Sequence, residues 1–180
     1  MSFTPETAFQ PRVWNNRNND TQNIAGRFYS SGRAADCSAG FLCARGEIDA
    51  DGVSRMTAAA NGSGTVYICN PSDVQRLQSP NGNVYAVGAN TLGLGIPAGV
   101  TDTFTEAVPG EIYSFGTGNF SDLPEEGSYF CRVSAGALTP GSAKPSGEIY
   151  FEVLPNLGSE MFTEGNRAAF GQVTVICRRG

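Results

Sequence analysis

Turn-forming residues interrupt this chain so often that no long helix fits between them. Glycine supplies 23 of the 180 residues and proline 10, and both residues disfavour helix interiors. Between them lie short segments in which apolar and polar residues alternate. In GEIYFEVLP, for example, Ile149, Phe151 and Val153 fall on one side of the chain. Alternation with a period of two is typical of strands. Such strands at spacings of about 10 to 15 residues, separated by glycine and proline, predict an all-β fold, a small β-sandwich or barrel.

The individual segments give a coarse strand map. We expect strands at 40–48, 53–58, 65–69 and 83–88 and a continuous series of strands and turns from residue 101 onward. The sequences DADG (49–52) and NGSG (61–64) predict turns between them, because their residues tolerate positive φ.

One stretch favours a helix instead. In NPSDVQRLQSP (70–80), Pro71 stands where a first helical residue would lie, and Val74 and Leu77 are three residues apart. The chain is therefore expected to hold at most one short helix.

The first residues differ from the rest and predict an extended N-terminal arm, residues 1–26, ahead of a single β-rich domain, residues 27–180. The arm contains Pro5 and Pro11 and five asparagines between residues 15 and 23, a composition that favours extended backbone and turns. It also carries the only tryptophan of the chain. Tryptophan and arginine are enriched at interface hot spots, so we expect the arm to order on a partner through five residues: Phe9, Arg12, Val13, Trp14 and Arg17. A tail without contacts is the alternative.

Charge and hydropathy limit the partners. The formal net charge is −5 and the isoelectric point is about 4.7, whereas a protein that binds nucleic acid directly needs a basic surface. No leader with a basic start and an apolar centre is present, and no apolar run is long enough for a membrane helix. We expect a soluble chain synthesised in the cytoplasm, without membrane or direct nucleic-acid contact.

The chain contains no histidine. Serine–histidine and cysteine–histidine catalysis are therefore excluded, and we expect neither an enzyme nor a bound cofactor or metal. The acidic EIDADG (47–52) has carboxylates spaced as in a calcium loop, but the required glutamate at position twelve is Ala58; an acidic hairpin turn is the simpler interpretation.

The five cysteines are expected to be buried free thiols, with Cys69, Cys131 and Cys177 inside strands. Cys37 and Cys43 could pair or bind a metal, although the lack of histidine and of a CxxC motif disfavours zinc.

Two long segments, YFCRVSAGALTPGSAKPSGEIYFEVLPN and the closing AAFGQVTVICRRG, resemble the β-rich decoration or cement proteins of tailed-bacteriophage capsids. The likeness extends over residues 64–180. It implies a structural virion protein on the outer capsid surface, bound to the major capsid protein and to copies of itself, often as a trimer, with an N-terminal segment reaching across neighbouring subunits. Five cysteines and a long asparagine-rich arm depart from that pattern.

A binding module for a receptor or carbohydrate, carried on a phage fibre or tail, is the alternative function. Under that hypothesis, Tyr113, Phe115 and Phe120 of EIYSFGTGNFSD would stack on a sugar ring. An alternating strand explains the same aromatic residues.

Overall fold

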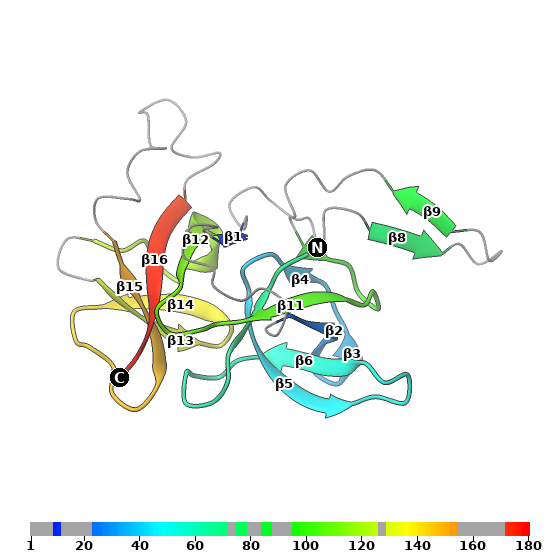
Figure 1. Ribbon diagram of the computed structural model, residues 1–180, viewed down its shortest axis with the longest axis horizontal. Coiled ribbons are helices and arrows are strands. Elements are labelled where there is room, and N and C mark those ends of the chain that lie inside the picture. The colour runs from blue at the N-terminus through cyan, green and yellow to red at the C-terminus, as the bar shows by residue number, and fades with distance from the viewer. Residues whose placement is uncertain are drawn as a thin grey trace.

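The computed structural model is nearly all β and confirms the expected fold class; of the two expected forms, sandwich and barrel, it contains a barrel (Figure 1). It describes seven parts of the chain, residues 9–11, 23–71, 75–78, 84–87, 95–125, 129–154 and 172–180. These form a closed five-stranded barrel beside a second, half-barrel sheet. In Figure 1 the barrel lies on the right and the half-barrel sheet on the left, with the chain passing from β11 to β12 between them.

The barrel closes because its first and last strands pair. Its strands, in the order of hydrogen-bonded neighbours, are β11 (Asp102–Glu106), β7 (Tyr67–Cys69), β5 (Leu42–Ile48), β6 (Ser54–Ala58) and β2 (Asn23–Ser30). β2 then pairs with β11 and completes the ring, and the short β3 (Arg33–Ala34) extends from β2. The β2–β6 pair is parallel, whereas the other pairs of the ring are antiparallel. Residues 23–26, at the end of the expected arm, belong to this ring.

The half-barrel sheet is antiparallel throughout. Its order is β1 (Phe9–Pro11), β12 (Ile112–Gly116), β16 (Gln172–Arg179), β15 (Ile149–Val153), β13 (Phe130–Ser134) and β14 (Ala137–Gly141). A single turn of 3₁₀ helix, η3 (Thr117–Asn119), follows β12 and is the only helical element in the described residues.

Two small pairs of strands complete the fold. β4 (Cys37–Ser38) pairs with β10 (Gly95–Ile96), and β8 (Gln75–Gln78) forms a hairpin with β9 (Val84–Val87). The strand expected at 83–88 is thus confirmed, but the helix expected within 70–80 is wrong, since residues 75–78 form a strand. A two-turn helix is too short to be stable alone, whereas residue-by-residue pairing with a Val- and Tyr-containing strand satisfies the backbone of both segments.

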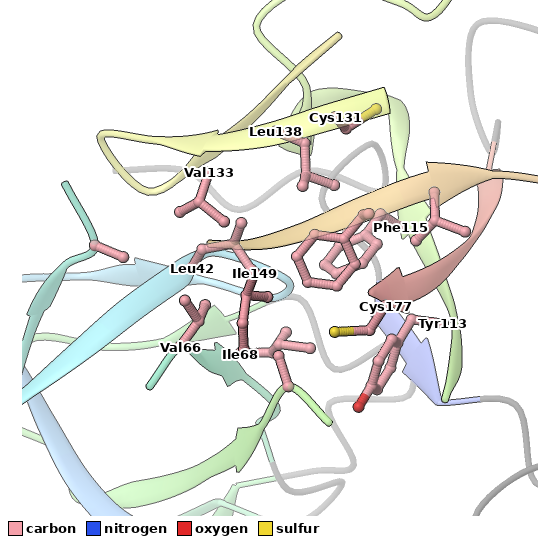
Figure 2. Close-up of a cluster of buried hydrophobic side chains, with 14 of the residues drawn as sticks. Leu42, Val66, Ile68, Tyr113, Phe115, Cys131, Val133, Leu138, Ile149 and Cys177 are labelled. Carbon is pink, nitrogen blue, oxygen red and sulfur yellow. The ribbon is translucent and has the colours of Figure 1, made fainter. Parts of the chain in front are cut away.

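A shared hydrophobic core joins the two large sheets. Leu42, Val66 and Ile68 enter it from the barrel side, and Phe115 and Ile149 from the half-barrel sheet (Figure 2). Its aromatic rings meet edge to face; the ring centroids of Phe115 and Phe151 lie 5.5 Å apart at an interplanar angle of 80°, a geometry that adds stability beyond burial. A second cluster, with Phe28, Met56 and Phe104, fills the barrel. The shared core fixes the half-barrel sheet, and with it β12, against the barrel.

Candidate interaction site

The edge of β12 is where part of the N-terminal arm meets the folded body. On one side β12 pairs with β16, from Ile112 opposite Ile176 to Gly116 opposite Gln172. On its other side it pairs with β1, which places Phe9 opposite Phe115 and Pro11 opposite Tyr113. The arm therefore contributes the outermost strand of the half-barrel sheet. A sheet edge offers a row of unpaired backbone N–H and C=O groups to such a strand.

β12 is a well-fixed template for this pairing. The side chains of Tyr113, Ser114 and Phe115 are all completely buried, so the strand is covered on both faces. The Ser114 and Thr174 hydroxyls lie 3.2 Å apart across the β12–β16 pair.

The Tyr113 hydroxyl fastens the start of β12. It accepts a 3.1 Å hydrogen bond from the Val108 backbone N–H and donates one of 3.1 Å to the Glu111 carboxylate. Burial, followed by the nearby Glu111 charge, raises the pKa of Tyr113 far above its usual value. The hydroxyl therefore remains a neutral donor.

Of the five arm residues expected to bind a partner, one lies in the described part of the chain. The backbone of Phe9 belongs to β1. The other four, Arg12, Val13, Trp14 and Arg17, lie outside the described residues.

The aromatic residues considered for sugar stacking are not at the surface. Tyr113 and Phe115 are 0% exposed and Phe120 is 8% exposed. All three belong to the shared core, where Phe115 packs edge-on against Phe120 with ring centroids 6.5 Å apart. The proposed sugar platform on these residues is therefore wrong. The alternative interpretation, an alternating strand, is correct: β12 is buried on both faces. The sequence pattern alone does not distinguish such a strand from one that exposes its aromatic residues.

All five cysteines are buried and free, as expected. The Sγ atoms of Cys37 and Cys43 lie 4.0 Å apart inside the barrel, and the Cys69 thiol donates to the Cys37 carbonyl oxygen at 3.6 Å. Burial raises the pKa of Cys43 and Cys69 well above the usual thiol value. In the part of the chain that the structure describes, no group of three histidine, cysteine, aspartate or glutamate residues is placed to hold a metal ion.

The acidic turn after β5 is a structural turn. Asp49 Oδ1 accepts hydrogen bonds from the backbone N–H groups of Asp51 and Val53 at 3.1 and 3.0 Å. Its other oxygen pairs with Arg27 of β2 at 3.3 Å. The hairpin interpretation of EIDADG is confirmed, and the Asp49 carboxylate ties the turn to the neighbouring strand β2.

Comparisons with known proteins found no match among protein-family models, curated proteins or solved structures. No helix within the described ranges is both long and apolar enough to span a membrane.

The sequence pattern predicted the arm but not the strand that it pairs with. The position of β12 in the sheet depends on its pairing with β16, about 60 residues away in the chain, and no local sequence pattern indicates such a pairing.

Proposed function

We propose that this chain is a structural virion protein that decorates and stabilises a bacteriophage capsid by binding the lattice of the major capsid protein. It acts at the outer capsid surface without chemistry of its own, alongside further copies of itself. Its N-terminal arm orders across neighbouring subunits. The all-β body and the sequence likeness of residues 64–180 to phage decoration proteins support this assignment.

The observation that carries the proposal is the pairing of β1 with β12. It brings an arm strand onto a rigid sheet edge through residue-by-residue backbone pairing. Strand addition of this kind is a recurrent mode of recognition, in which main-chain hydrogen bonds supply affinity. An arm that uses this mode can join a sheet edge of a neighbouring subunit in the same way.

Stabilisation by such a protein follows from mass action. A protein that binds the mature lattice and not its disrupted form shifts the equilibrium toward the lattice. Many copies on a repeating surface multiply the effect.

The test compares phage particles with and without this chain. We expect many copies per particle by mass spectrometry, and a lower temperature of DNA release from particles that lack the chain. Particles that carry no copies, or that are equally heat resistant without it, would refute the assignment.

Arm variants test the mechanism. Deletion of residues 1–22 removes the arm but keeps the barrel, whose first strand begins at Asn23. We expect this variant to keep its far-ultraviolet circular dichroism spectrum and to lose particle binding. Trp14→Ala should weaken binding, whereas the matched arm control Asn16→Ala should not. Normal decoration by the truncated chain would contradict the role of the arm.

A further inference from the structure

A second candidate site lies on the barrel, beside the β2–β3 hairpin. A surface hollow of about 350 Å³ opens there, within the size range of small-ligand sites. Its lining includes Tyr29, Ser30, Ser31, Arg55 and Thr57. Phe28, Gly32 and Ala58 complete the lining, so two aromatic residues, one arginine and three serine or threonine residues border one cavity.

Arg55 is held in place by the ring of Tyr29. The guanidinium carbon lies 4.8 Å from the ring centroid, a cation–π contact that orients the planar fork. β2 and β6 pair in parallel, with Arg27 opposite Arg55 and Phe28 opposite Met56. This pairing brings the side chains of Tyr29 and Arg55 to the same region of the barrel wall.

Positive charge at this hollow is not neutralised by the described part of the protein. Neither Arg55 nor the nearby Arg33 forms an ion pair with any carboxylate of the described residues, and no acidic residue lines the hollow. Arg33 stands opposite Ser30 at the base of the hairpin. The acidic turn residues Asp49 and Asp51 pair with Arg27 instead.

The hairpin turn at the rim has a fixed shape. Ser31 and Gly32 both have positive φ, 51° and 77°, which is typical of the tight two-residue turn that joins antiparallel strands. Ser31 holds this conformation although it is not glycine. The turn fixes the Ser30 and Ser31 end of the hollow relative to Arg55.

We propose that this hollow binds an acidic sugar, with the sugar carboxylate on Arg55 and the sugar hydroxyls on the serine and threonine side chains. An oriented guanidinium recognises a carboxylate through two parallel hydrogen bonds. The hydroxyl-bearing rim matches the many hydroxyl groups of a sugar. This site is independent of the arm and of the capsid role.

The experiment titrates the full chain with methyl β-glucuronide and with N-acetylneuraminic acid. Binding is measured by isothermal titration calorimetry and by shifts of the Tyr29 ring signals in NMR spectra. Methyl β-glucoside serves as the neutral sugar and acetate as the bare carboxylate. We expect at least one acidic sugar to bind, with affinity falling as salt rises. The affinity for the neutral sugar and for acetate should each be lower by at least about tenfold, since each of them lacks half of the contacts.

Variants locate the site. Arg55→Gln should abolish the binding, and Arg55→Lys should restore only part of it, because lysine keeps the charge but loses the planar fork. Arg178→Gln, an exposed arginine on β16, is the matched control and should bind as the original chain does. Circular dichroism checks that each variant is folded.

Four results would overturn the inference: no binding of either acidic sugar, equal binding of the neutral sugar, equal binding of acetate, or equal loss in the Arg178→Gln control. Equal binding of acetate would identify a simple anion site instead.

Discussion

A single methyl group added to Gly62 tests the contact that joins the two sheets. Gly62 lies in the connection between β6 and β7, where it is buried, and its carbonyl oxygen accepts a 2.7 Å hydrogen bond from the Ile149 backbone N–H at the start of β15. A Cβ on Gly62 would overlap the carbonyl oxygen of Ile149 and would lie 3.0 Å from its carbonyl carbon and its nitrogen. The obstacle is backbone, so it cannot be relieved by a side-chain rotation.

The magnitude follows from three contributions to the free energy of unfolding. Overpacking against fixed neighbours costs about 1 to 3 kcal/mol, and loss of the Ile149–Gly62 hydrogen bond costs about 1 kcal/mol. Replacing glycine by alanine restricts the unfolded chain and returns about 0.4 to 1 kcal/mol. The net expectation for Gly62→Ala is a loss of about 2 kcal/mol, or about 4 to 8 °C in Tm for a chain of this size.

Gly64→Ala is the matched control, two residues further along the same connection. Nothing lies within 4 Å of the position that its Cβ would take, so we expect no loss and a gain of at most about 1 kcal/mol. Urea denaturation followed by circular dichroism, in a reducing agent because all five cysteines are free, measures both variants. Equal stability of Gly62→Ala and Gly64→Ala would refute the reasoning that the contact between Gly62 and Ile149 packs the half-barrel sheet against the barrel.

Two further changes test the core and its titrating groups. Tyr113→Ala, which removes a fully buried ring and its hydrogen bonds, should lower the free energy of unfolding by about 3 to 5 kcal/mol; a fully stable variant would contradict the buried placement. Burial raises the pKa of Cys131 and of Cys177 to about 12 each. The thiols of the unfolded chain ionise at a lower pH than those of the folded protein. The contribution of the two buried thiols to the free energy of unfolding is therefore complete below the unfolded thiol pKa. It is lost as pH rises toward 12, by about 1.4 kcal/mol per pH unit for each thiol. Urea midpoints between pH 8 and pH 10 should therefore fall, less steeply in Cys131→Ala; a flat profile would count against this.

Some of the candidate site could be anticipated and some could not. The composition of residues 1–26 marked an arm, and the backbone of Phe9 does meet the sheet. The β12 edge that receives it carried no local signal. Tyr29 and Arg55 are 26 positions apart in the sequence and become neighbours only through the parallel β2–β6 pair.

The sequence by itself determined that this is an all-β protein with turns at 49–52 and five buried thiols, because alternation, glycine placement and side-chain chemistry act over a few residues. Tertiary structure decided which strands pair, that β2 and β11 close a ring, that residues 75–78 form a strand, and that Tyr113 and Phe115 lie inside. Strand pairing satisfies backbone groups with partners far along the chain. Whether a given alternating strand has one face or both faces covered therefore depends on contacts that no short stretch of sequence contains.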